Sequence, residues 1–271
     1  MTQRADAALA ARGLARSRTH AQRLIAEGLV TAGGTPVAKA STPVADDVPL
    51  VVAGADHYVS RAAHKLIAAL DAFAVDPARR VALDMGASTG GFTQVLRERG
   101  AEPVFAVDVG HGQLDASLRD DPGVIVVEGF NVRSLTRASL AAAAGTDAVP
   151  DLVTGDLSFI SLTHVLPAAA QTATGDADHV LLVKPQFEVG RTGVREGIVT
   201  DPGLRADAVA GVLWAAWDAG LGTCGVIASP IAGTRGNREF LVHLRPRAAD
   251  ARPGGNPTEW MSTVYERAGA A

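Results

Sequence analysis

The segment HVLLVKPQF, residues 179–187, places a lysine directly after a run of apolar residues. Lys184 is one of only three lysines in a chain that contains twenty-two arginines. Arginine stays charged in proteins, whereas a lysine removed from water can release its proton and act as a base. A lysine at the end of a buried strand therefore predicts proton-transfer chemistry, which a guanidinium cannot perform.

Two carboxylates and a second lysine could share the same site. Asp156 ends one predicted strand, Glu239 begins another, and Lys65 flanks the apolar stripe of a predicted helix. If these strands are neighbours of the strand that ends at Lys184, their ionisable groups stand in a row about 4.8 Å apart. The alternative interpretation is a set of ordinary salt bridges, with Lys65 exposed on its helix.

The segment VALDMGASTGGFTQVL, residues 81–96, predicts a strand, a loop of small residues and the start of a helix. Its glycines let the backbone approach a ligand closely, and Ser88 and Thr89 add hydroxyls near a helix N-terminus. Asp108 ends the next predicted strand, where a carboxylate can bind ribose hydroxyls. The spacing D-x-G-x-x-x-G-G lacks the lysine of a P-loop and favours S-adenosylmethionine over a nicotinamide cofactor, although a dehydrogenase stays open from the fold alone. The predicted cofactor-binding residues are Asp84, Gly86, Ala87, Ser88, Thr89, Gly90, Gly91, Phe92, Asp108 and Asp156.

Most of the chain predicts an α/β fold. Helical segments separate the first six predicted strands, and a short loop joins the last two, which indicates a doubly wound, Rossmann-like, mostly parallel sheet with one antiparallel strand. The seven predicted strands are residues 81–84, 103–108, 124–127, 151–156, 179–184, 224–229 and 239–244. We expect this domain to span residues 60–247, with a C-terminal tail at 248–271.

Residues 1–59 predict a separate small α+β domain. Two short helices precede a hairpin about Gly33 and Gly34, and Ser17 is the expected N-cap of the second helix. Residues 1–65 hold eight Lys/Arg and five Asp/Glu, a net charge of +3, whereas the remainder of the chain carries −7. This asymmetry indicates a docking module joined to a second domain. The arginines of this module include Arg4, Arg16, Arg18 and Arg23.

Composition excludes several classes of protein. With 271 residues, 47% hydrophobic and 20% charged, the chain is typical of a folded soluble protein. Its single cysteine, Cys224, excludes an internal disulfide framework and a multi-cysteine zinc site, and it fits a reducing cytoplasm. No uncharged apolar segment reaches the ~20 residues of a membrane-spanning helix. We therefore expect a cytoplasmic protein with no membrane partner.

The whole chain resembles the TlyA-type rRNA (cytidine-2′-O)-methyltransferases, in which an S4-like RNA-binding domain precedes an FtsJ-like methyltransferase domain. The matching motifs, in their usual order, are SRTHAQRLIAEGLVTAGG, VSRAAHKL, LDMGASTGGFTQVL, AVDVGHGQL, GDLSFISL, VKPQFEVG and GNREF. The resemblance implies a class I methyltransferase fold with S-adenosylmethionine as cofactor and no metal. It also implies ribosomal RNA or ribosomal subunits as partner, with cytidines of 23S and also 16S rRNA as targets. In an RNA-binding role, Arg4, Arg16, Arg18 and Arg23 would bind phosphates of the RNA.

The resemblance further implies a catalytic tetrad formed by Lys65, Asp156, Lys184 and Glu239. In the sheet order common to such enzymes, the fourth, fifth and seventh strands are neighbours, which is the condition for these groups to meet. Lys184 would then take the proton of the ribose 2′-hydroxyl while the carboxylates orient the lysines. One departure from the family is the linker ADHYVSR, which lacks the tryptophans of some relatives.

Other functions remain as alternatives. A non-catalytic ribosome-assembly factor would also use an S4-like domain, and some relatives in this family are labelled haemolysins. A cytosine-C5 methyltransferase needs a thiolate, but Cys224 lies in a predicted strand and is expected to be a packing residue. An amino-group methyltransferase would show an Asn/Asp-Pro-Pro-aromatic segment where this chain has DLSF.

Overall fold

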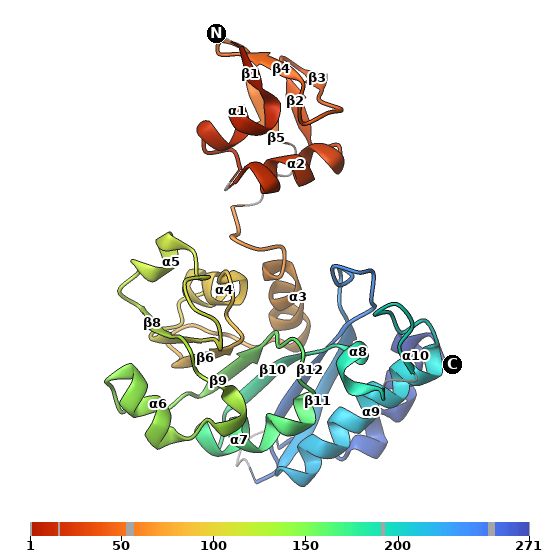
Figure 1. The fold of residues 1–271 in the computed structure, drawn as a ribbon. Coiled ribbons are helices and arrows are strands. Elements are labelled where there is room, and N and C mark those ends of the chain that lie inside the picture. Colours follow the sequence, from red (N-terminus) through yellow and green to blue (C-terminus); the bar gives the residue numbers. More distant parts are fainter. Residues whose placement is uncertain (1, 16, 53–56, 191–192, 249–252, 271) are drawn as a thin grey trace. The chain divides into compact units, whose positions relative to one another are not determined.

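The computed structural model describes residues 2–15, 17–52, 57–190, 193–248 and 253–270, which form two compact units (Figure 1). The first unit ends at His57 and the second begins at Tyr58. The described part of the C-terminal segment belongs to the second unit.

The described residues of the N-terminal unit form two helices and five very short strands. The predicted hairpin is confirmed, with β2 and β3 paired across the turn at Gly33 and Gly34, and Ser17 caps α2 by accepting a hydrogen bond from the amide of His20. Strands β1 and β4 pair antiparallel, and β2 lies between β3 and β5. The elements are β1 (Thr2–Arg4), α1 (Ala5–Ala11), α2 (Arg18–Ala26), β2 (Val30–Ala32), β3 (Thr35–Pro36), β4 (Pro43–Ala45) and β5 (Leu50–Val52).

A buried carboxylate links the two helices of this unit. The Asp6 side chain is fully buried and accepts hydrogen bonds from Arg4 Nε at 3.0 Å, Arg18 at 3.3 Å and Gln22 Nε2 at 2.9 Å. Hydrogen bonds from Arg4 above all hold the pKa of Asp6 well below its ordinary value. Asp6 therefore stays ionised and connects the start of α1 to α2.

The second unit is built on a seven-stranded sheet with the order β11-β12-β10-β9-β6-β7-β8. Strand β12 runs antiparallel to both β10 and β11, and the pairs among β10, β9, β6, β7 and β8 are parallel. The predicted mostly parallel sheet with one antiparallel strand is confirmed, as is the adjacency of its fourth, fifth and seventh strands. The strands are β6 (Ala82–Met85), β7 (Val104–Val107), β8 (Val124–Val127), β9 (Leu152–Gly155), β10 (Asp178–Val183), β11 (Leu221–Ala228) and β12 (Phe240–Pro246).

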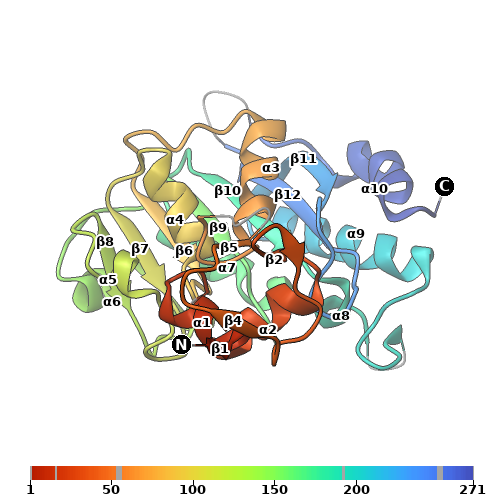
Figure 2. The same cartoon turned by 90° about the horizontal axis from the view of Figure 1, so that it is seen from above.

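Helices cover both faces of this sheet (Figure 1). Successive strand residues point to opposite faces, so Ala82 packs with α3 and α4 while Leu83 packs with α7 and α9. Figure 2 shows β8 and α5 at one margin of this unit and α10 at the other. The helices are α3 (Ala63–Phe73), α4 (Gly91–Glu98), α5 (Ala116–Arg119), α6 (Arg137–Ala144), α7 (Leu166–Thr172), α8 (Pro185–Glu188), α9 (Pro202–Asp218) and α10 (Met261–Ala268), with short 3-10 turns at Val132–Ser134, Leu162–His164 and Pro257–Trp260.

Burial on both faces leaves the ends of the strands as the place where polar side chains of the sheet can meet a ligand. Among the described residues, no helix is both long enough and apolar enough to cross a bilayer.

We predict that Asp6→Asn weakens the N-terminal unit. The substitution keeps the size of the side chain but removes the charge to which Arg4 and Arg18 donate, so amides of α1 and α2 should exchange with solvent about tenfold faster or more. Hydrogen exchange on the full-length chain measures this, with the amides of β6 and β9 as internal control. Unchanged exchange in both helices would contradict the role given to Asp6.

Candidate active site

The site is built where parallel strands end and the antiparallel strand begins. Asp156 follows the last residue of β9, and Lys184 follows the last residue of β10. Glu239 directly precedes β12, whose first residue pairs with the last residue of β10. Because β12 runs opposite to its neighbours, its beginning lies at the edge where theirs end, which brings these three side chains together.

Helix α3 adds the fourth group. Its apolar residues Leu66 and Leu70 are buried against the sheet, and this packing turns Lys65 inward. The Lys65 side chain is almost fully buried and reaches the carboxylate of Glu239.

The four predicted catalytic residues form one continuous set of ion pairs. Lys184 Nζ lies 2.6 Å from Asp156 Oδ1, Lys65 Nζ lies 3.8 Å from Asp156 Oδ2, and Lys65 Nζ lies 2.6 Å from Glu239 Oε2. The exposed fraction of the side chain is 10% for Lys184, 16% for Asp156, 7% for Lys65 and 3% for Glu239. Two cationic and two anionic side chains thus offset one another in a site that is largely shielded from solvent. Lys184 and Asp156 are the more solvent-accessible members of the set.

The glycine-rich loop between β6 and α4 lies beside this set. Gly86 has φ 80°, and a Cβ there would lie 2.9 Å from Leu157 Cδ2 and 3.1 Å from the carbonyl oxygen of Asp156. Gly90 has φ 99°, and a Cβ there would lie 2.2 Å from Leu118 Cδ1. Both positions therefore require glycine, and at Gly86 the missing side chain lets Leu157 and the backbone of Asp156 approach the loop closely.

Two hollows flank the loop. The smaller, of about 160 Å³, includes Lys184 and Asp156 in its wall. The larger is a cleft of about 870 Å³, within the range of sites for cofactors of nucleotide size. Of the predicted cofactor-binding residues, Gly86, Ala87, Ser88, Thr89, Gly91, Phe92 and Asp156 line the smaller hollow, and Gly86, Ser88, Asp108 and Asp156 line the cleft.

Asp108 is held in place at the cleft by backbone amides. Its Oδ2 accepts a hydrogen bond from the amide of Ser88 at 2.8 Å, and its Oδ1 accepts one from the amide of Gly110 at 2.7 Å. Each carboxylate oxygen has a second lone pair, so Asp108 can still accept hydrogen bonds from a pair of ribose hydroxyls.

Two predicted cofactor-binding residues, Asp84 and Gly90, line neither hollow. Asp84 is fully buried and accepts hydrogen bonds from Thr93 Oγ1 at 2.6 Å and Thr154 Oγ1 at 3.2 Å. Burial raises the pKa of Asp84 to about 6, and these hydrogen bonds limit the rise. The carboxyl group connects β6 to α4 and β9 beneath the loop.

A third hollow, of about 350 Å³, lies on the other side of Lys184, and apart from Lys184 and Glu239 its lining residues were not predicted as site residues from sequence. Lys184 and Glu239 line it together with Gln186, Phe187 and Arg235, among others. Phe159 also borders it, with φ 64° and 92% of the side chain exposed, and its ring centroid lies 5.3 Å from that of Phe187. The motif DLSF contains Phe159, but nothing in its spacing indicates that the ring would be exposed.

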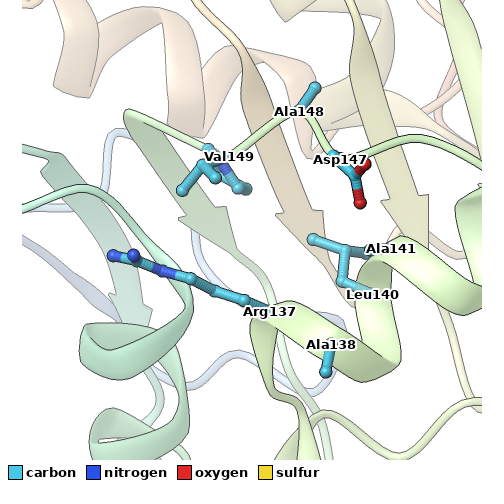
Figure 3. A pocket seen from close by; sticks show the side chains of 8 residues that line it. Arg137, Ala138, Leu140, Ala141, Asp147, Ala148 and Val149 are labelled. Atoms are coloured by element: carbon cyan, nitrogen blue, oxygen red, sulfur yellow. The ribbon is translucent and has the colours of Figure 1, made fainter.

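A further hollow, of about 220 Å³, lies near the start of β9, away from the ends at which Asp156 and Lys184 stand (Figure 3). Figure 3 shows Arg137 extending away from Asp147. The Arg137 guanidinium donates hydrogen bonds to the carbonyl oxygens of Thr172 and Ala173 at the end of α7. Its charge therefore stabilises a helix C-terminus, and this hollow is separate from the candidate site.

Cys224 and the metal-binding side chains offer no competing chemistry in the described part of the chain. Cys224 is half-buried in β11, and burial raises the pKa of its thiol, which disfavours the nucleophilic thiolate. No group of three or more His, Cys, Asp or Glu among the described residues could hold a metal ion.

The predicted RNA-binding arginines lie in the N-terminal unit. Arg4 and Arg18 share the single carboxylate of Asp6, so a net positive charge remains there, and both side chains are exposed. Arg23 Nε lies 3.8 Å from Glu27 Oε1 on the same helix, and both groups are exposed. Arg16 lies outside the described residues.

Comparison with known proteins covers both units. Residues 58–246 match the FtsJ-like methyltransferase family, and residues 3–47 match the S4 domain. The 16S/23S rRNA (cytidine-2′-O)-methyltransferase TlyA of Mycobacterium tuberculosis strain H37Rv is 51% identical over 245 residues, 89% of each chain. Hemolysin A of Brachyspira hyodysenteriae is 35% identical over 89% of this chain and 99% of its own. A solved structure from Streptococcus thermophilus that carries a hemolysin name is 36% identical, covers 99% of this chain and 96% of its own, and has a TM-score of 0.76.

We predict that Asp84→Asn changes how stability depends on pH. The folded pKa of Asp84, about 6, lies above its ordinary value of 3.8. The stability contributed by the protonated carboxyl is fully present below about pH 3.8 and is lost as the pH rises through 6. Asn does not titrate, so the free energy of unfolding of the variant minus that of the wild type should increase by up to about 3 kcal/mol from pH 4 to pH 7.

Urea unfolding followed by tryptophan fluorescence measures this difference, because the three tryptophans, Trp214, Trp217 and Trp260, all lie in the second unit. A difference between variant and wild type that is the same at every pH would show that Asp84 does not titrate in this range.

Proposed function

The chain belongs to the FtsJ-like methyltransferase family, and we propose that it methylates the 2′-oxygen of cytidine in 16S and 23S rRNA, with S-adenosylmethionine as methyl donor and Lys184 as general base. One observation carries the proposal: Lys184, paired with Asp156, lines both the hollow beside the glycine-rich loop and the hollow on its far side. A base at that boundary can serve a donor on one side and a nucleotide on the other.

The residues around the large cleft fit the donor. Gly86 and Asp108 both line the cleft, and the carboxylate of Asp108 has free lone pairs for ribose hydroxyls. When bound, the donor supplies an electrophilic methyl group on a positively charged sulfur. Asp156 belongs to the walls of both hollows that flank the loop, so its carboxylate can face that charge.

Lys184 takes the proton from the 2′-hydroxyl as the oxygen attacks. A ribose hydroxyl is a weak nucleophile, so positioning and proton removal are the main requirements of the reaction. The tetrad of Lys65, Asp156, Lys184 and Glu239 is neutral as a whole when all four groups are charged. With Lys184 uncharged it carries one negative charge, which suits a cationic donor and the proton that arrives.

The third hollow suits the target nucleotide. Phe159 and Phe187 present adjacent rings on which one base can stack, and Arg235 adds a cation in the same wall. A cytidine that has left its helical stack can place its ribose next to Lys184 from this side. Stacking then applies to one nucleotide, while most of the RNA is recognised by shape and backbone.

The N-terminal unit contributes affinity for the phosphate backbone. Its exposed cations, Arg4, Arg18 and Arg23, can position the rRNA without reading its sequence. A ribosome-assembly factor without enzymatic activity would use the same contacts. RNA binding therefore does not distinguish the two functions, and an assay of methyl transfer is needed.

The test is to incubate the purified protein with labelled S-adenosylmethionine and each ribosomal subunit, and then to map the modified nucleotide. We expect label on the 2′-oxygen of cytidine. Label on a base nitrogen or carbon would contradict the proposal, and tight binding without transfer would favour the assembly factor.

Replacing Lys184 with Arg should lower kcat at least about 100-fold, because a guanidinium cannot accept the proton. The charge stays, so affinity for S-adenosylhomocysteine should change little. Lys39→Arg is the matched control, since Lys39 is exposed in the N-terminal unit and should tolerate the change. Near-normal turnover by Lys184→Arg would refute the assignment of Lys184 as the general base.

Replacing Arg23 with Gln should weaken binding to ribosomal subunits a few-fold and lower the slope of log affinity against log salt concentration by about one. Bound enzyme should keep its kcat. Arg267→Gln, an equal change of charge on the exposed side of α10, serves as control. Equal losses for both variants would indicate that only total charge matters and that the S4 surface is not the contact.

A further inference from the structure

Ser158 lies in the loop after β9, two residues beyond Asp156, and borders all three hollows around the tetrad. Its hydroxyl oxygen accepts a hydrogen bond from Lys184 Nζ at 2.8 Å, and the serine as a whole is exposed. Asp156 contacts the same nitrogen as an ion pair at 2.6 Å. The terminal nitrogen of Lys184 is therefore in contact with a carboxylate, as an ion pair, and with a hydroxyl, as a hydrogen bond.

The loop that carries Ser158 is fastened to the segment that carries Lys184. Glu188, the last residue of α8, accepts hydrogen bonds from Ser161 Oγ at 2.5 Å and from the amide of Leu162 at 2.9 Å. Helix α8 begins directly after Lys184. These hydrogen bonds hold the loop, three and four residues beyond Ser158, next to the helix that follows Lys184.

We propose that Ser158 is a positioning residue that orients the nitrogen of Lys184 toward the substrate hydroxyl. This inference rests on the proposed function, because it requires Lys184 to act as the base. An uncharged amine has two N–H groups and one lone pair. Ser158 accepts one N–H group, and the carboxylate of Asp156 lies against the nitrogen at 2.6 Å on another side, which restricts the directions open to the lone pair. Accepting the proton does not require the Ser158 contact to rearrange.

The neutral hydroxyl has a role that a second carboxylate could not fill. An additional anion next to Lys184 would favour its charged form and so oppose its use as a base. A hydroxyl accepts an N–H from the amine and from the ammonium alike, so it can orient the nitrogen in both states.

The test compares Ser158→Ala and Ser158→Thr in single-turnover methylation of ribosomal subunits with both substrates saturating. Ser158→Ala should lower the rate about tenfold, since the lone pair is no longer fixed. Its KM for subunits and its affinity for S-adenosylhomocysteine should stay within about twofold of the wild-type values. Ser158→Thr retains a hydroxyl and should recover most of the rate. Because Ser158 is exposed, we expect both variants to fold, and tryptophan fluorescence during urea unfolding checks this.

Measuring Lys184→Arg beside these variants separates the two claims. If Lys184→Arg is inactive while Ser158→Ala turns over at the wild-type rate, the positioning role of Ser158 is overturned. The assignment of Lys184 as the general base is then retained. If both Ser158 variants lose activity equally and mainly through KM, Ser158 acts in binding and the inference is also overturned. If Lys184→Arg is active, the base assignment fails, and the inference fails with it.

Discussion

The structure of the site depends on four charges that must offset one another in a nearly dry place. An isolated ammonium or carboxylate removed from water is strongly unfavourable, and it is tolerated only with a partner of opposite charge. In the tetrad, Lys65 lies between Glu239 and Asp156, and Asp156 lies between the two lysines. Removing one member therefore leaves another buried without its partner of opposite charge. The four side chains therefore depend on one another for their stability in the site.

The sheet provides the geometry for this arrangement. Parallel strands end at one edge, so β9 and β10 bring Asp156 and Lys184 to the same place. The antiparallel insertion of β12 between β10 and β11 brings Glu239 there from the other direction. An all-parallel sheet would place the residue before that strand at the opposite edge. Helix α3 then adds Lys65 through the packing of its apolar stripe.

Much of this could be predicted from the chain alone, because strand ends and apolar runs are visible in sequence. All seven strands of the second unit were predicted, although β11 begins at Leu221 and not at residue 224. Asp156 and Lys184, predicted as the last residues of their strands, lie one residue beyond β9 and β10. The short strands β1, β4 and β5 were not, since three residues each give no readable alternation. The hydroxyl of Ser158 and the exposed ring of Phe159 depend on a loop backbone with φ 64° at Phe159, and no periodic pattern encodes such a loop. Asp6 was likewise missed as the buried partner of Arg4 and Arg18.

The most direct test of the central claim is a structure of the full-length protein with S-adenosylhomocysteine and an rRNA fragment that contains the target cytidine. We expect the 2′-oxygen of that cytidine within hydrogen-bond reach of Lys184 Nζ, about 3 Å, with the sulfur of the donor product on the other side of the oxygen. A 2′-oxygen out of reach of Lys184, with another group closer to it, would contradict the account of this site.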